Sequence, residues 1–228
     1  MLPMMVFLVA FAIPAVLLVA AGFRQGRIDP GLPLAILGLW PAVVILACGL
    51  AFAGQPGGLE GAMRAAVEQG LRRMGSSSAQ MPVDQLVQVM AAALGFWAAI
   101  SLSVNGAAAQ SALARSGWAL APTPRWSEVR LPDWYPPLTG AGAAVWLVFG
   151  GDGDVVALSV LLVLLLPVFL QGIAAVHRRS AGRPGRNFML GVFYAGLVIL
   201  SVPAAIAVTA FGFYEQWGRR SSPPGGTT

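Results

Sequence analysis

Six long stretches of this 228-residue chain contain no charged residue. They are Met1–Phe23, Pro30–Leu59, Gln85–Ala114, Trp134–Gly151, Val155–Val176 and Phe188–Tyr214. A helix needs about 20 apolar residues to cross a bilayer, and five of the stretches are long enough. The fourth has 18 residues and a proline-rich start, so it is marginal. Backbone groups in lipid must bond within their own segment, and no alternating barrel pattern occurs, so the stretches predict helices.

The composition excludes an ordinary soluble domain. Hydrophobic residues make up 57% of the chain and charged residues only 10%, whereas soluble domains carry about 25% charged residues. We therefore predict an all-α integral membrane protein with about six transmembrane helices, in a lipid bilayer. Residues 1–220 are predicted to form one polytopic membrane domain, and residues 221–228 a disordered tail.

One further helix is predicted outside the six stretches. In "GGLEGAMRAAVEQGLRR", apolar residues recur every four positions and form one stripe. Glu60–Arg64 and Glu68–Arg72 are i,i+4 pairs on another face, each worth about 0.2–0.5 kcal/mol. We expect an amphipathic helix that lies on the membrane or on the protein's own surface. The stripe consists of Leu59, Met63, Val67 and Leu71.

Farther along the chain, Asp154 is expected to cap the start of the helix in the fifth stretch.

Every basic residue is an arginine, 14 against nine acidic residues. Most of them flank the apolar stretches, where arginines anchor and orient helices, so no nucleic-acid partner is expected. With six spans, nine arginines lie on one side and five on the other, which predicts the nine in the cytoplasm and both chain ends outside. Arg178, Arg179, Arg183 and Arg186 are candidates for contact with the membrane surface or a protein partner.

Polar residues within the apolar stretches are the candidates for a ligand cavity. Trp97, Ser101 and Asn105 are spaced by four and share one helix face, Gln171 follows the helix-kinking Pro167, and Tyr194 lies on the last stretch. Buried polar groups need partners, so these residues are expected to face inward. Two interpretations remain: hydrogen bonds between helices, or a small-molecule cavity among kinked helices.

No catalytic or metal-binding constellation is apparent. The chain has one histidine, His177, and one cysteine, Cys48, which excludes a paired-histidine metal site and a cysteine-rich one. We expect no enzyme activity, no metal and no cofactor. The segment "RLPDWYPPLTG", Arg130–Gly140, is interpreted as a membrane entry, with Arg130 and Asp133 at the aqueous edge and Trp134 and Tyr135 in the aromatic belt.

The second half of the chain carries a recognisable order of short motifs, from "SGWALAPTPRWSEVRLPDW" through "LQGIAAVHRR" to "FGFYEQWGRR". It resembles the bacterial YybS-like family of inner-membrane proteins of unknown function. The resemblance covers residues 82–220, and the first two helices more loosely. Members have an Asp before the last Trp, whereas here Glu215 stands nearby. The residues that carry it are Ser116-Gly117, Leu131-Pro132, Gln171-Gly172, His177, Tyr194 and the terminal Gly212, Trp217 and Arg220.

The resemblance implies a multi-pass protein of the bacterial inner membrane that lacks the family's first helices. The family is similar in layout to the substrate-binding subunits of energy-coupling-factor transporters. One hypothesis is therefore a transporter component that binds a small hydrophobic or vitamin-like ligand. The alternative is a structural or interaction protein that contacts a membrane protein partner through its basic loops.

Overall fold

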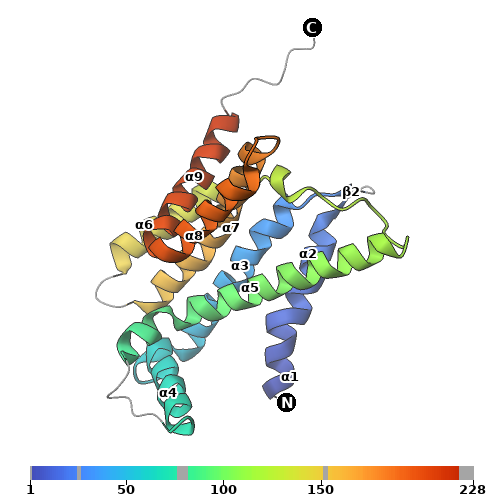
Figure 1. Ribbon diagram of the computed structural model, residues 1–228. Helices are drawn as coiled ribbons and strands as arrows, with labels where there is room; N and C mark the ends of the chain where they lie inside the picture. Colours follow the sequence, from blue (N-terminus) through green and yellow to red (C-terminus); the bar gives the residue numbers. More distant parts are fainter. Residues whose placement is uncertain (1, 25–26, 76–81, 151–153, 221–228) are drawn as a thin grey trace.

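The computed structural model describes residues 2–24, 27–75, 82–150 and 154–220, which are almost entirely helical (Figure 1). Two strands of two residues each, β1 and β2, pair antiparallel between the helices α2 and α3. In chain order the elements are α1 (Leu2–Phe7), the π-helix η1 (Leu8–Ala12), α2 (Ile13–Gly22), β1 (Phe23–Arg24), β2 (Arg27–Ile28), α3 (Gly31–Phe52), α4 (Gly58–Arg73), α5 (Val83–Arg115), the 3₁₀ turn η3 (Trp126–Glu128), α6 (Tyr135–Phe149), α7 (Val155–Ser180), α8 (Arg186–Leu200) and α9 (Val202–Arg220).

Four helices of the described residues are long and apolar enough to cross a membrane, which confirms a helical membrane protein. They are Met4–Gly22, α3, α5 and α7. The described residues do not confirm the predicted number of six spans. The helix α6 has 15 residues, or about 22 Å at 1.5 Å per residue, and is therefore shorter than the roughly 30 Å hydrocarbon core.

The last apolar stretch, Phe188–Tyr214, is broken, where the sequence predicted one helix. Helix α8 ends at Leu200, Ser201 has a φ of 43°, and α9 begins at Val202. Pro203 has no N–H to donate to the carbonyl four residues earlier, so a continuous helix would lose a hydrogen bond there. The chain reverses there instead of kinking, so α9 runs back alongside α7 (Figure 1).

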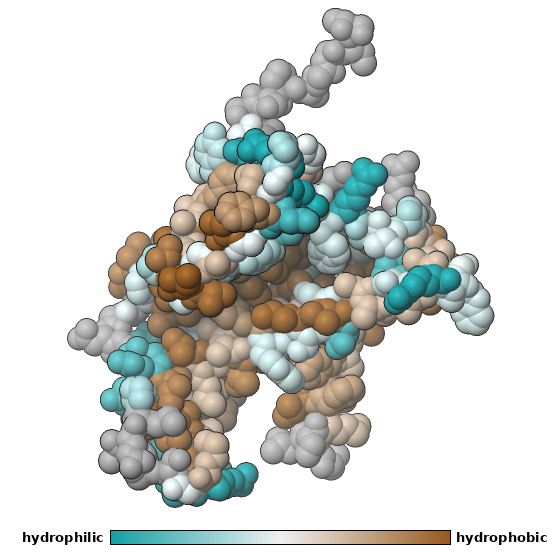
Figure 2. Space-filling view, viewed as in Figure 1, coloured by the Kyte–Doolittle hydropathy of each residue, from teal (hydrophilic) through white to brown (hydrophobic). Residues whose placement is uncertain are grey.

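The helix ends gather into two opposite groups. At one end, the carbonyl of Arg130 lies against Gly31 at the start of α3, and Arg178 near the end of α7 bonds to the carbonyl oxygen of Ser127. At the other end, α4, the start of α5 and the start of α7 share one cluster of buried apolar residues. Figure 2 shows hydrophilic side chains over the ends of α7 and α9 and over α4, with hydrophobic side chains between them.

The amphipathic helix is confirmed as α4, and it lies on the protein's own surface. Three of its four stripe residues are buried against the bundle. Both predicted ion pairs form, Glu60–Arg64 at 3.3 Å and Glu68–Arg72 at 3.6 Å. Arg64 also reaches Asp84 of α5 at 2.6 Å, and Asp84, with Glu60, raises the pKa of the Arg64 guanidinium.

Helix α7 is the centre of the bundle and contacts α3, α5, α6 and α9. It begins as predicted, because the carboxylate of Asp154 accepts from the N–H groups of Val156 and Ala157 at 2.9 and 3.1 Å. It meets α3 and α5 at Gly95, where an added Cβ would lie 2.9 Å from Val163 and 3.1 Å from Pro41. The tail at 221–228 lies outside the described residues.

Candidate functional site

The five residues predicted to line a ligand cavity are not brought together. Trp97 and Asn105 are exposed, and Ser101 is half-buried, on a face of α5 that adjoins the cavities described below without lining them. Tyr194 lies on α8, with its hydroxyl 2.7 Å from Nε2 of His177. Gln171 is buried in α7. The five residues therefore do not share a cavity among the described residues.

Gln171 instead joins a buried polar cluster between α7, α9 and the segment before α6. Its Oε1 accepts from the N–H of Leu131 at 2.8 Å. Its Nε2 donates to the carbonyl of Gly212 at 3.2 Å and to Oε1 of Gln216 at 2.9 Å. Gln216 in turn donates to the carbonyl of Leu131 at 2.9 Å and to Asp133 at 3.3 Å. These five residues are called the Gln171 cluster below.

The two glutamines of this cluster provide hydrogen-bond partners for the buried backbone of Leu131. Leu131 is 3% exposed and lies outside any helix. Backbone polar groups that are buried outside a helix need partners within the protein. Gln171 accepts a hydrogen bond from the N–H of Leu131, and Gln216 donates one to the carbonyl of Leu131. The interpretation of Gln171 as a bond between helices is the one that the contacts favour.

The entry segment is more deeply embedded than its sequence indicated. Tyr135 is completely buried, so its predicted place in the aromatic belt is wrong, whereas Trp134 is half exposed. The Tyr135 hydroxyl donates to the carbonyl of Leu164 at 3.0 Å. The hydroxyl fits because the facing residue on α3 is Gly38, where a Cβ would overlap it.

Helices α7 and α9 touch through two glycines. A Cβ at Gly172 would overlap the carbonyl oxygen of Val208, and one at Gly212 would overlap that of Val168. Small residues permit this close approach of two helix backbones in membranes. The crossing brings the amide groups of Gln171 and Gln216 within hydrogen-bonding reach.

Two of the four arginines proposed for surface or partner contact are engaged inside the protein. Arg178 and Arg179 both pair with Glu215 of α9, whose side chain is 8% exposed. Arg179 also lies over the ring of Phe211, 4.9 Å from its centroid. Arg183, in the turn before α8, and Arg186, the first residue of α8, are exposed.

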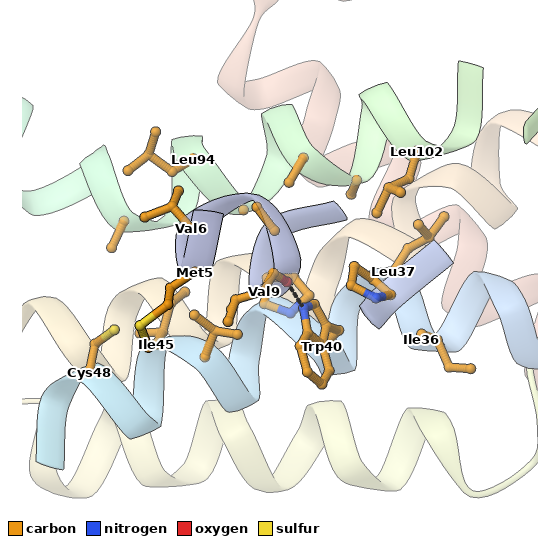
Figure 3. Close-up of a pocket in the computed structure, with 18 of the residues that line it drawn as sticks. Met5, Val6, Val9, Ile36, Leu37, Trp40, Ile45, Cys48, Leu94 and Leu102 are labelled. Atoms are coloured by element: carbon orange, nitrogen blue, oxygen red, sulfur yellow. Dashed lines mark hydrogen bonds between the residues drawn. The ribbon is translucent and has the colours of Figure 1, made fainter. Parts of the chain in front are cut away.

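A first cavity lies between α1–η1, α3 and α5. It has a volume of about 420 Å³ and an almost wholly apolar lining. Figure 3 shows Met5, Val6 and Val9 facing it from one side, Trp40, Ile45 and Cys48 of α3 from another, and Leu94 and Leu102 of α5 from a third.

The polar group of Trp40 is satisfied within this cavity wall. Its Nε1 donates to the carbonyl of Val9 at 2.8 Å. In η1 the N–H of Ile13 bonds to Leu8, five residues back. The next donor in that register would be Pro14, which has no N–H. The indole N–H of Trp40 therefore donates to the carbonyl of Val9 in place of the N–H that Pro14 lacks.

The second cavity continues from the first along α2 and the later part of α5. It has a volume of about 610 Å³, and both cavities are lined by Leu18, Leu37 and Leu102. Its wall is apolar along the helices, while Ser103, Gln110 and Thr123 add polar groups. The two cavities together are called the apolar groove. It follows the first helix from Met5 to Phe23, or about 27 Å.

Sequence reasoning missed both the groove and most of the partners of Gln171. The groove is lined by Ala98, Leu102 and Gly106 of α5, each one residue after a predicted member of the Trp97, Ser101 and Asn105 face. The prediction selected polar residues and so took the adjacent face. Gln216 and Leu131 lie 45 and 40 residues from Gln171, where only the motifs of the family resemblance pointed to them.

Comparison with known proteins gives one match. A family model described as "Predicted membrane protein (DUF2232)" matches residues 59–214, from α4 to the last turns of α9. No curated protein and no solved structure matches the chain.

Proposed function

Because the chain belongs to this family of predicted membrane proteins, we propose that it is a multi-pass protein of the bacterial plasma membrane that binds an elongated, largely apolar small molecule in the apolar groove. Binding is the part of this role that the groove supports. A transport step, as the ligand-binding component of a transporter, is proposed on the resemblance to energy-coupling-factor substrate-binding subunits alone. The proposed role includes no catalytic step.

The single observation behind this proposal is the size and lining of the groove. Ligand pockets have volumes of about 300–1,000 Å³ and apolar walls with few polar groups. The two adjoining cavities measure about 420 and 610 Å³. Their shared length of about 27 Å is close to the hydrocarbon thickness of a bilayer. An extended chain fits this shape better than a compact, polar vitamin.

The polar groups of the groove indicate which end holds a head group. Gln110 donates to the carbonyl of Ala121 at 3.1 Å, which fixes the 120–126 segment over the cavity. Thr123 and Trp126 of that segment line the same cavity. We propose that the apolar chain of the ligand extends toward Met5 and that its polar group lies beside Thr123.

The alternative, an interaction protein that works through its basic loops, draws less support. Arg178 and Arg179 are paired with Glu215, so a partner would have to displace an internal ion pair to use them. Arg183 and Arg186 are exposed and keep this alternative testable by their replacement with glutamine, followed by detection of co-purified membrane proteins.

The binding proposal is tested by blocking the groove from α5. Ala107 lines the second cavity, whereas its exposed neighbour Ala108 does not. Native mass spectrometry of protein released from membranes should show a bound lipid-like molecule. We expect Ala107→Phe to lose that molecule and Ala108→Phe to keep it, because only the first ring fills the cavity. Wild-type protein without a bound molecule, or equal retention in both variants, would contradict the proposal.

The depth of the bound molecule is tested in the same way at the first cavity. Ala98 lines it, whereas Ala93 is exposed and does not. Loss of the molecule in Ala98→Phe, with retention in Ala93→Phe, is expected for a chain that runs the length of the groove. A ligand confined to the second cavity would stay bound in both variants, and that result would contradict an elongated ligand.

A further inference from the structure

The arginines of this chain are unequally divided between the two ends of the bundle. Eleven of the 14 belong to elements at the end where α2, α5, α7 and α9 finish. The other three, Arg64, Arg72 and Arg73, lie on α4 at the opposite end. The eleven are Arg24, Arg27, Arg115, Arg125, Arg130, Arg178, Arg179, Arg183, Arg186, Arg219 and Arg220.

Contacts between distant segments establish that this end is shared. The second cavity joins the end of α2 to residues 120–126. Gly31 lies against the carbonyl of Arg130, and Arg178 bonds to the carbonyl of Ser127. Glu215 ties α9 to α7 beside the same segment. We call this the arginine-rich end.

The opposite end is established just as directly. Met5 near the start of α1 and Cys48 near the end of α3 line one cavity. An added Cβ at Gly49 would lie 3.1 Å from the side chain of Val156, at the start of α7. Val155 packs in the cluster that also holds residues of α4 and the start of α5. This is called the α4 end.

The break at Ser201 decides where the last two arginines belong. A single helix from 187 to 217 would have carried Arg219 and Arg220 to the α4 end, which is why alternate counting gave only nine against five. Because α8 and α9 are separate, α9 returns beside α7 and its last residues lie at the arginine-rich end (Figure 1).

Lysine and arginine in the short connections next to membrane helices favour the cytoplasmic side. From the eleven-to-three division we infer that the arginine-rich end faces the cytoplasm and the α4 end faces the opposite side. The first helix then enters the membrane from outside, and the last described residues of α9 lie inside. This corrects the expectation that both ends lie outside, and it does not depend on the proposed ligand.

The orientation is tested by labelling single cysteines. Cys48→Ala gives a cysteine-free background, because Cys48 is the one cysteine of the chain. At the α4 end, Gln55→Cys and Met74→Cys place a thiol at exposed sites, and Met74 is 71% exposed. At the arginine-rich end, Trp118→Cys and Ala181→Cys do the same, and Trp118 is 79% exposed.

In intact spheroplasts, a membrane-impermeant maleimide should label the cysteines at 55 and 74. It should label those at 118 and 181 only after the membrane is permeabilised. The reverse pattern would overturn the orientation, and different behaviour at 118 and 181 would overturn the shared end. Labelling in detergent confirms that each variant is present.

A second measurement leaves Cys48 in place. A fluorescent protein fused after Thr228 should fluoresce, because that domain matures in the cytoplasm, and alkaline phosphatase at the same site should be inactive. An active phosphatase with a dark fluorescent fusion would overturn the inference.

Discussion

The two sides of the helix bundle are held by different kinds of contact. On the side of α6, α7 and α9, buried amide groups are matched one to one and two helices touch through glycines. On the side of α1–α2, α3 and the later part of α5, apolar surfaces line a groove. In the most apolar 18-residue part of α7, half of the residues are buried inside the protein. The corresponding share for Met4–Gly22 is 6%.

This difference separates the part of the protein that fixes the fold from the part that can accommodate a guest. Apolar contact alone does little to hold helices together in lipid, because lipid tails are as apolar as leucine. Close glycine packing and matched hydrogen bonds hold α7 against α9. The side-chain hydrogen bond from Trp40 to the carbonyl of Val9 joins residues 4–22 to α3. The first helix can therefore move more easily than α9.

The largest effect is expected where the two helix backbones touch. In Gly172→Leu the new side chain must displace the carbonyl of Val208. We expect a loss of about 3 kcal/mol, at the upper end for overpacked interiors, measured by SDS-induced unfolding in mixed micelles. Gly106→Leu is the control, because nothing lies within 4 Å of a Cβ there, and it should be no less stable than wild type. Equal losses in the two variants would break the comparison.

A smaller effect is expected at the centre of the Gln171 cluster. Gln171→Leu keeps the volume but leaves the N–H of Leu131 and Oε1 of Gln216 without this partner. An unsatisfied buried group costs about 1–3 kcal/mol, so we expect a loss of about 2 kcal/mol in the same unfolding measurement. Asn105→Leu, at an exposed position of α5, should change stability by less than about 0.5 kcal/mol. Similar effects of the two changes would show that the cluster does not hold α9.

Parts of this fold were accessible from sequence because they depend on local patterns. The lengths of the apolar stretches predicted the four spans, and the stripe of apolar residues at every fourth position predicted α4. The position of Asp154 before an apolar stretch predicted that it caps α7. Each of these depends on residues within a few turns of one another.

The features that the sequence did not predict depend on distant partners. Pro203 lies beside the break in the last apolar stretch, but a full reversal also requires α9 to have a surface on α7 to pack against. Tyr135 is typical of an aromatic belt, and only the contact with Gly38, which leaves room for its hydroxyl, shows that it is buried. Most of the groove lining is apolar, and alanines, leucines, valines and glycines of this kind carry no chemical signal in the sequence until helices enclose them.

Hydrogen–deuterium exchange in detergent micelles tests the contrast between the two sides most directly, because local opening exposes the amides of loosely held helices first. The contacts predict that amides of residues 166–178 and 206–216 exchange at least about tenfold more slowly than those of residues 9–21 and 104–113. Equal protection on both sides, or faster exchange in α7 and α9, would contradict the account of a fixed side and an adaptable one.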